Sequence, residues 1–533
     1  MTNYDFIIAG GGTAGCILAN RLTENGKYRV LMIEAGDERQ NMWISIPAGF
    51  SKLLTNPKFN WRFQTEPEAN LYGRTISVPR GKGIGGSSLI NGMIYVRGQP
   101  QDYDAWEAGG AQGWGFKDVG KYFSNIENYA RGDANRGKTG PMHLEQVGER
   151  FAVSDAFIAA AAEDGQPLND DYNGQDQEGF GYYQVLQHQG KRWSVVDGYL
   201  APARRRSNLT VQSNAQIIKL IFEGKRCVGL VYRKKGQEFT VRAGRETILC
   251  LGAIQTPQIL ELSGVGNPDT LQSFGIPVVH AQKNVGENYI DHFATRMNWR
   301  VKNTVTLNEM SRGWRLAKQV AKYYTAHKGI LCLGTGLVHG FIKTSPQLST
   351  PDVQYFFVHA SYANAAERIL DKQPGMTIGV AQLRPESVGT IHIKSKNPYD
   401  GPAIRPNFLS EQADRECLIK GMQIARRIVG QPSMRPYVDH ELSPGSSTNT
   451  SDEWLDFARK NGQTIYHPIG TCRMGTDEGA VTDVRLRVNG LEGLRIVDAS
   501  VMPRMVSGNT QGAVMMVAEK GAEMILEDAN GRH

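Results

Sequence analysis

The sequence predicts an α/β protein (α+β overall) with more than one domain, and three observations support this. The chain has 533 residues, whereas one domain usually has about 100–200. Residues 4–34 follow the order strand, glycine-rich turn, helix and strand, which is typical of a parallel sheet covered by helices. Between residues 300 and 465 the pattern changes to longer loops and alternating strands, such as 353–359 and 389–393.

The composition is that of a globular protein. Hydrophobic residues make up 40% and charged residues 21%, so general disorder is excluded. The net charge of +7 is small for this length, and no run of lysine and arginine forms a basic stripe, so we expect no nucleic-acid partner. The 60 glycines cluster near residues 10–15, 81–86 and 108–115, which predicts tight turns and close backbone approaches.

The cysteines and the apolar segments bear on cellular location. The six cysteines lie far apart, without a CxxC pair or zinc-like spacing, so we predict reduced thiols and no metal site. No apolar run has the eighteen residues of a membrane span, and no basic segment precedes the apolar stretch 6–19. We therefore expect a cytoplasmic protein without a transmembrane segment or a signal peptide. The basic amphipathic stretch 314–328 leaves peripheral membrane association open, although a solvated helix face is favoured.

The N-terminal segment predicts a Rossmann-like dinucleotide site. The apolar strand pattern 4–9 is followed by residues 10–15, which fit GxGxxG, and helical spacing then continues to residue 24. A second strand pattern, 28–33, ends at Glu34. Because strand, glycines, helix, strand and acid occur in this order, the motif is much more specific than its glycines alone.

The residue types in this motif suit a dinucleotide. Gly10 allows the tight turn, Gly12 lets the backbone approach a pyrophosphate, and Gly15 lets the helix pack closely on the strand. The helix N-terminus supplies N–H groups and a positive dipole to the phosphates. Glu34 is placed to accept hydrogen bonds from ribose hydroxyls, and its charge disfavours a 2′-phosphate. The motif by itself leaves FAD and NAD as alternatives.

Six separated motifs resemble those of one family. The glycine-rich segment 80–92 and the segment 252–266 resemble the two signatures of the glucose–methanol–choline (GMC) flavin oxidoreductases. Further family-like segments are 284–292, 466–475, 497–500 and 507–510. Because the motifs follow the family order along essentially the whole chain, the sequence is identified as a member of this family. The resemblance is strongest to bacterial alcohol and L-sorbose-type dehydrogenases and to furfuryl-alcohol oxidases.

The resemblance implies FAD as the cofactor and two discontinuous domains. A Rossmann-like FAD-binding domain takes residues 1–40, 75–110, 200–295 and 465–533. A substrate-binding domain takes residues 41–74, 111–199 and 296–464, and has a large antiparallel sheet with flanking helices beside the flavin. Strand patterns at 208–212, 217–222 and 246–251 agree with this discontinuity.

The resemblance also implies how the cofactor is held. Some relatives attach FAD covalently through a histidine at the position of Ile90, so we predict non-covalent FAD here. Asn91 offers donor and acceptor groups to the polar edge of the flavin, and the main chain at Ile217 receives the adenine. The expected cofactor-binding residues are Gly10, Gly12, Thr13, Ala14, Gly15, Glu34, Gly83, Gly86, Asn91, Gly92, Ile217, Asp498, Ala499, Asn509 and Thr510.

His467 and Asn509 match the catalytic pair of the family. The resemblance places His467 opposite flavin N5 and Asn509 at the partner position. A neutral imidazole, with an ordinary pKa of about 6.5, can take the hydroxyl proton of an alcohol while hydride leaves the carbon. Asn509 cannot titrate, but its amide can hold the substrate oxygen. It also precedes a predicted helix, 510–528, so helix capping is an alternative explanation for this asparagine.

The expected function is FAD-dependent oxidation of a primary alcohol, or of a polyol or sugar hydroxyl, with electrons passed to oxygen or a quinone-like acceptor. The alternatives are a hydroxynitrile-lyase-type flavoprotein and oxidation of choline or pyridoxine-like alcohols. Choline is less favoured because the sequence shows no obvious anionic aromatic cage. Tyr355, Phe357 and His359 alternate on one strand face, for which packing is favoured over lining a substrate cavity.

Overall fold

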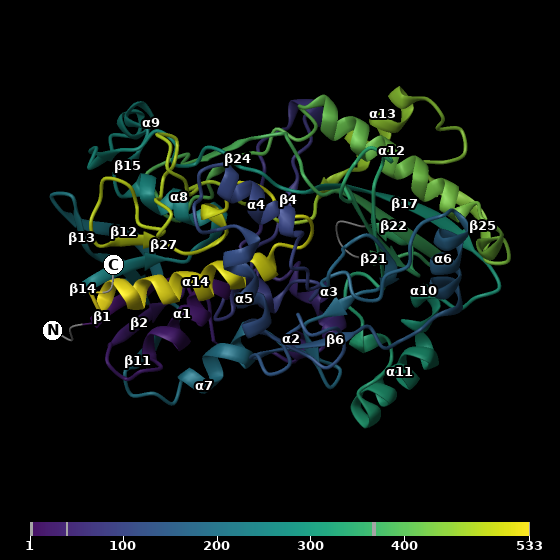
Figure 1. The fold of residues 1–533 in the computed structure, drawn as a ribbon, viewed down its shortest axis with the longest axis horizontal. Coiled ribbons are helices and arrows are strands. Elements are labelled where there is room, and N and C mark those ends of the chain that lie inside the picture. The colour runs from purple at the N-terminus through teal and green to yellow at the C-terminus, as the bar shows by residue number, and fades with distance from the viewer. Residues whose placement is uncertain (1–3, 39–40, 365–368, 532–533) are drawn as a thin grey trace.

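The computed structural model describes residues 4–38, 41–364 and 369–531 (Figure 1). Within this part of the chain, two seven-stranded sheets form the centres of two regions that lie side by side (Figure 1). Buried side chains from both regions belong to one continuous hydrophobic core. The predicted mixture of helices with more than one large sheet is confirmed.

The first sheet is parallel on one side and antiparallel on the other. Its strand order is β11-β2-β1-β14-β13-β12, and β27 also pairs with β14. The pairs formed by β11, β2, β1, β14 and β27 are parallel, whereas β12, β13 and β14 form an antiparallel meander. The strands are β1 (Tyr4–Ala9), β2 (Val30–Ile33), β11 (Leu209–Gln212), β12 (Gln216–Glu223), β13 (Arg226–Lys234), β14 (Gln237–Leu249) and β27 (Leu494–Ile496).

Two helices that were predicted from apolar spacing pack on each other beside this sheet. α1 (Thr13–Thr23) follows β1, and most of its residues are buried. α14 (Gln511–Ala529) contacts α1 and is the yellow helix of Figure 1. Strand β14 begins earlier than predicted, because its first half pairs with β13 and only its second half with β1.

The second sheet is antiparallel throughout, as expected. Its order is β25-β17-β22-β19-β18-β7, and β26 also pairs with β17. Every residue of β22 is buried, and α12 (Gln412–Val429) packs against this strand. The strands are β7 (Gly179–Tyr182), β17 (Phe293–Val301), β18 (Val338–Ile342), β19 (Val353–Val358), β22 (Gly375–Gln382), β25 (Val438–Ser443) and β26 (Gln463–Thr464). The domain boundaries themselves stay a prediction.

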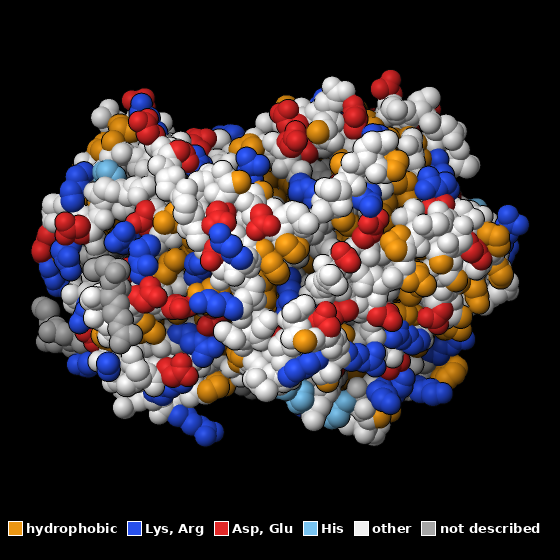
Figure 2. Space-filling model, in the orientation of Figure 1, with side chains coloured by type: hydrophobic (Ala, Val, Ile, Leu, Met, Phe, Trp, Pro, Cys, Tyr) orange, Lys and Arg blue, Asp and Glu red, His pale blue; other side chains and the backbone are white. Residues whose placement is uncertain are grey.

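The predicted amphipathic segment forms a surface helix, α11 (Gly313–Ala326). Its Trp314 is 72% exposed, and only Tyr323 of this helix is buried. None of the helices in the described residues is long and apolar enough to cross a membrane. Figure 2 shows acidic side chains interspersed among basic ones over most of the visible face.

Candidate functional site

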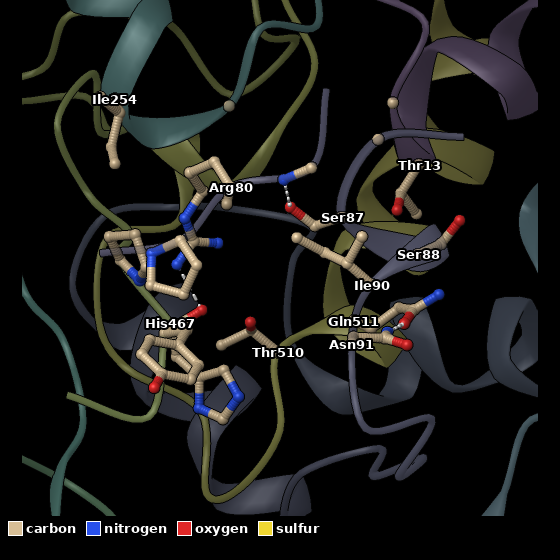
Figure 3. A pocket seen from close by; sticks show the side chains of 18 of the residues that line it. Thr13, Arg80, Ser87, Ser88, Ile90, Asn91, Ile254, His467, Thr510 and Gln511 are labelled. Atoms are coloured by element: carbon tan, nitrogen blue, oxygen red, sulfur yellow. Dashed lines mark hydrogen bonds between the residues drawn. The ribbon is translucent and has the colours of Figure 1, made fainter. Parts of the chain in front are cut away.

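A cavity of about 320 Å³ lies between the β1–α1 turn and the second sheet. Its walls also include parts of the segment 79–94, the first turns of α8 (Gly252–Leu262) and the residues around His467 and Asn509. In Figure 3, Thr13 lies on the right of the view with Asn91 below it, His467 lies on the left, and Thr510 lies between the two sides. The cavity therefore joins the glycine-rich motif to the predicted catalytic pair.

The structure brings most of the predicted site residues to this cavity. The residues that line it are Gly10, Gly12, Thr13, Ala14, Glu34, Gly86, Asn91, Gly92, Ile217, His467, Asp498, Ala499, Asn509 and Thr510. Gly15 and Gly83 do not line it. The roles assigned to these residues stay predictions.

The turn between β1 and α1 opens the N-terminus of the helix to the cavity. Gly10 has a φ of 107°, which favours glycine, and Gly12 is the helix N-cap without any side-chain cap. A Cβ on Gly12 would lie 3.9 Å from the Cys250 carbonyl oxygen, whereas a Cβ on Gly15 would lie 2.0 Å from the Gly10 carbonyl oxygen. The uncapped N-terminus can therefore receive a phosphate, and Gly15 serves close packing.

Glu34 follows β2 and is bound by backbone groups of the protein. Its Oε2 accepts the N–H of Gly11 at 2.9 Å, and its Oε1 accepts those of Gly36 at 2.8 Å and Gly83 at 3.1 Å. Burial raises the pKa of this carboxyl, and the three N–H donors oppose the shift. The residue predicted to hold a ribose therefore also ties the β1–α1 turn to the Gly83 loop.

Asn91 lines the cavity, but protein groups bond both ends of its amide. Its Oδ1 accepts from Arg192 Nη1 at 2.6 Å and from the Met93 N–H at 3.2 Å. Its Nδ2 donates to Gln511 Oε1 (Figure 3). Gln511 Nε2 is buried and has no hydrogen-bond partner among the described residues, so it is a donor left for a bound group.

Asp498 holds two segments of the cavity wall together. Its Oδ2 accepts from the Gly252 N–H at 2.8 Å and from Thr256 Oγ1 at 2.6 Å. Its Oδ1 accepts both the N–H and the hydroxyl of Ser500, at 2.8 Å and 2.6 Å. Asp498 thereby fixes the start of α8 against the segment that contains Ala499.

The capping role considered for Asn509 is wrong. The N-cap of α14 is Thr510, and no side chain caps this helix. The Asn509 side chain points instead to Gln354, whose Nε2 lies 3.2 Å from Asn509 Oδ1, and to His467. The N–H groups at the start of α14 thus stay open, beside the cavity that Thr510 lines.

His467 lies in a loop that hydrogen bonds hold in place. The preceding residue, Tyr466, has a φ of 73°, a left-handed conformation that is unfavourable without glycine. The His467 N–H donates to Asp291 Oδ1 at 2.8 Å, and Thr464 Oγ1 donates to Asp291 Oδ2 at 2.5 Å. Arg80 Nη2 donates to the Tyr466 carbonyl at 2.5 Å (Figure 3). These contacts fix the backbone that carries the imidazole.

The His467 ring lies between two polar partners. Its Nε2 is 3.3 Å from Asn509 Nδ2, and its Nδ1 is 2.9 Å from Nδ1 of His292. Desolvation, with smaller contributions from His292 and Arg80, holds the pKa of His467 well below 6.5. A neutral imidazole beside a cavity can accept a proton near neutral pH.

The side chains of β19 that line the cavity lie on the face opposite to the one that carries Tyr355 and Phe357. Tyr355, Phe357 and the following His359 are buried in the core, so the favoured packing interpretation is confirmed. Phe356 and Val358 line the cavity instead. Alternation in the sequence identifies residues that share a face, but it does not say which face meets the cavity.

Several polar residues at the site were not predicted. Asp291 and His292 lay in a family-like segment without an assigned role, and Arg296 follows them on β17 and lines the cavity. Gln354 orients Asn509 from β19. A single arginine or glutamine inside a strand has no distinctive sequence pattern, so only the fold identifies these two.

Comparison with known proteins identifies the family of the chain. The GMC oxidoreductase family models match residues 4–294 and 385–518. An alcohol dehydrogenase (acceptor) of Pseudomonas putida is 39% identical over 531 residues, which cover 98% of this chain and 96% of the relative. The mitochondrial choline dehydrogenase of Mus musculus is 37% identical over 545 residues, which cover 99% and 91%. An FAD-dependent oxidoreductase from Chaetomium thermophilum has a TM-score of 0.91 at 26% identity, over 99% of this chain and 100% of that one. The chain therefore belongs to the GMC oxidoreductase family.

Proposed function

We propose that this protein oxidises the hydroxyl group of an uncharged primary alcohol, or of a polyol or sugar, to a carbonyl group, with FAD as its cofactor. The observation that carries the proposal is the pair His467 and Asn509, with Nε2 and Nδ2 3.3 Å apart in the wall of the cavity. The relatives named alcohol dehydrogenase and choline dehydrogenase support an alcohol as the substrate.

The residues around the cavity fit FAD. The uncapped N-terminus of α1 would hold the diphosphate, with Glu34 and Ile217 at the adenosine end. Gln511 Nε2 and the uncapped N-terminus of α14 would face the ring system. The side chain of Ile90 lines the cavity and has no nucleophilic atom, which supports non-covalent binding. FAD, when bound, supplies the acceptor for the hydride.

His467 and Asn509 divide the work on the substrate. His467 Nε2 takes the hydroxyl proton, which raises the electron density on the substrate oxygen and favours departure of hydride from the adjacent carbon. Asn509 Nδ2 donates a hydrogen bond to the same oxygen and orients it. The cavity wall beside them, with Phe356 and Val358, suits an apolar substituent on the alcohol.

The charges of the cavity wall argue against a cationic substrate. Arg80 and Arg296 line the cavity, and both carry a positive charge. The two carboxylates among the lining residues are Glu34 and Asp498, and protein donors already bond both oxygens of each. A quaternary ammonium such as that of choline would therefore meet repulsion without a carboxylate to balance it.

The electron acceptor and the cellular location belong to the same proposal. We expect oxygen or a quinone-like compound to reoxidise the flavin. The cytoplasmic location stays a prediction, and the six cysteines, all free thiols, support it. A hydroxynitrile-lyase-type enzyme remains the second candidate class from the sequence, and it would leave the flavin oxidised when its substrate binds.

Anaerobic mixing of the FAD-loaded protein with alcohols tests the proposal. The panel contains aliphatic, benzylic and furfuryl alcohols, L-sorbose, pyridoxine and choline, and the flavin absorbance is recorded. We expect bleaching by an uncharged alcohol, and its loss in His467→Ala with FAD retained. His440→Ala is a matched control, because this histidine is exposed and its ring contacts the neighbouring Asp439, away from the cavity lining. Full-rate bleaching in His467→Ala would refute the assigned base.

A further inference from the structure

His292 is a buried histidine that contacts the proposed base but does not line the cavity. It lies just before β17, is fully buried, and has its Nδ1 2.9 Å from Nδ1 of His467. Its Nε2 lies 2.8 Å from the carbonyl oxygen of Leu383. The two rings meet edge to face, with an angle of 81° between their planes. Both ring nitrogens of His292 are therefore used in specific contacts.

The chemistry of these partners fixes the proton on His292. A carbonyl oxygen can only accept a hydrogen bond, so the Leu383 contact requires the N–H of His292 at Nε2. Burial lowers the pKa of His292 to about 4, so the ring is neutral near pH 7 and has one N–H only. Nδ1 of His292 consequently carries a lone pair.

This arrangement then determines the state of His467. Two imidazole nitrogens 2.9 Å apart need one proton between them, and His292 Nδ1 has none to give. The proton must come from Nδ1 of His467, which leaves Nε2 of the neutral ring unprotonated. Asn509 Nδ2, the amide end that donates, lies 3.3 Å from this Nε2, which agrees with the same assignment.

We propose that His292 is a positioning residue that keeps the proton of His467 on Nδ1, so that Nε2 faces the cavity as a proton acceptor. The position of the proton follows from the contacts alone. The inference rests on the proposed function only where it treats Nε2 of His467 as the base that takes the hydroxyl proton. Asp291, the residue before His292, accepts the hydrogen bond of the His467 backbone N–H and does not contact the ring through that bond. A chain of two hydrogen bonds therefore connects the Leu383 carbonyl, His292 and His467.

Direct observation of the ring nitrogens tests the assignment without any turnover. The FAD-loaded protein is prepared with ¹⁵N-labelled histidine, and the nitrogen shifts and long-range proton couplings are recorded near pH 7. His467→Gln identifies the signals of His467 by their loss. We expect a protonated Nδ1 and an unprotonated Nε2 for His467, and the reverse for His292. A His467 ring protonated at Nε2 would overturn the proposal.

A matched pair of substitutions tests the consequence. His292→Asn places an amide oxygen near the former Nδ1 and keeps an acceptor for His467, whereas His292→Leu has a similar volume and no acceptor. We expect His292→Leu to move the proton of His467 to Nε2 and to slow anaerobic flavin reduction by about 10²-fold or more, the lower end of the effect of a general base. His292→Asn is expected to keep both the proton position and most of the rate. An unchanged proton position and rate in His292→Leu would refute the positioning role.

The outcomes separate this inference from the proposed function. If no alcohol of the panel bleaches the flavin of the wild-type protein, the proposed function fails, and the nitrogen signals still decide the proton position. If His467→Ala is inactive but the ring is protonated at Nε2, only the inference fails. Should His292→Leu fail to fold, the wild-type spectrum together with His292→Asn decides, since loss of rate with an unchanged His467 tautomer would contradict the positioning role.

Discussion

Gln354 sets the orientation of Asn509. Its Nε2 donates to Asn509 Oδ1 at 3.2 Å and lies 2.9 Å from the hydroxyl oxygen of Tyr183. Because the amide oxygen of Asn509 is bound on this side, its Nδ2 points to His467 Nε2. Gln354, a buried residue of the antiparallel sheet, thus orients the side chain of Asn509, which precedes α14 and lies 155 positions later in the sequence.

Replacing Asn509 is expected to slow catalysis more than binding. Asn509→Ala removes the donor next to the proposed base, so we expect the rate constant of anaerobic flavin reduction to fall on the order of 10²-fold. The affinity for FAD should change little, because Thr510 and Gln511 remain. Stopped-flow absorbance at saturating alcohol measures this rate, and exposed Asn25→Ala is the control. A fall in apparent alcohol affinity at a constant rate would show instead that Asn509 only binds substrate.

The pH dependence of the reaction should follow the buried histidine. Burial holds the pKa of His467 well below 6.5, so the ring loses its proton at lower pH than an exposed histidine. We therefore expect kcat/KM to stay constant as the pH falls through 6.5, and to decrease only in more acidic solution. An acid limb centred at 6.5 or above would contradict a buried, neutral base.

Asp291 is the group to control in that experiment. Burial raises its pKa to about 6, and it holds the His467 backbone through an accepted hydrogen bond. Its folded pKa lies above the ordinary value of 3.8, so its favourable contribution to stability is complete below 3.8 and is lost as the pH rises through 6. Asp291→Asn removes this titration. Because His467 is expected to cause the decrease of kcat/KM in acid, the decrease should also be seen in Asp291→Asn.

Local sequence patterns predicted the elements better than the contacts between them. Periodicity and glycine placement predicted the β1–α1 turn and helix α14. Strand β2 was also predicted, but it begins at Val30 and not at residue 28. The relation of His292 to His467 depends on β17 meeting a loop 175 positions later in the chain, which no local pattern encodes. For the same reason, the bond from the Gly83 N–H to Glu34 was not foreseen.

Two glycines of the nucleotide motif should respond differently to alanine. Gly15→Ala places a Cβ 2.0 Å from the Gly10 carbonyl oxygen, so we expect a loss of at least about 2 kcal/mol in the free energy of unfolding. Gly12→Ala finds its nearest neighbour at 3.9 Å, so the apoprotein should stay within about 1 kcal/mol of wild type. Denaturant unfolding of the apoproteins measures both.

The same pair separates packing from cofactor binding. Gly12 faces the cavity and Gly15 does not, so Gly12→Ala should weaken FAD binding by about 10-fold or more, or ~1.4 kcal/mol. Fluorescence titration of the apoprotein with FAD measures this affinity. Unaltered FAD affinity in Gly12→Ala would mean that the diphosphate does not approach this turn.

Denaturation tests whether FAD is bound without a covalent link. Ile90 lines the cavity and offers no atom for a covalent link to the flavin. We expect acid precipitation to release all of the yellow colour into the supernatant, with a colourless pellet. Colour retained by the precipitated protein would show covalent attachment at another residue, and peptide mapping would locate it.

Arg296 is expected to disfavour cationic alcohols. It lies on β17 and lines the cavity, as do Ala294 and Thr295. Arg296→Gln removes one positive charge from the cavity wall, so the ratio of kcat/KM for choline to that for an uncharged alcohol should rise by about 10-fold, equivalent to ~1.4 kcal/mol. Arg296→Lys keeps the charge and should leave the ratio near that of wild type. If both variants change the ratio equally, the size of the arginine, and not its charge, governs the selection, and the electrostatic argument against choline fails.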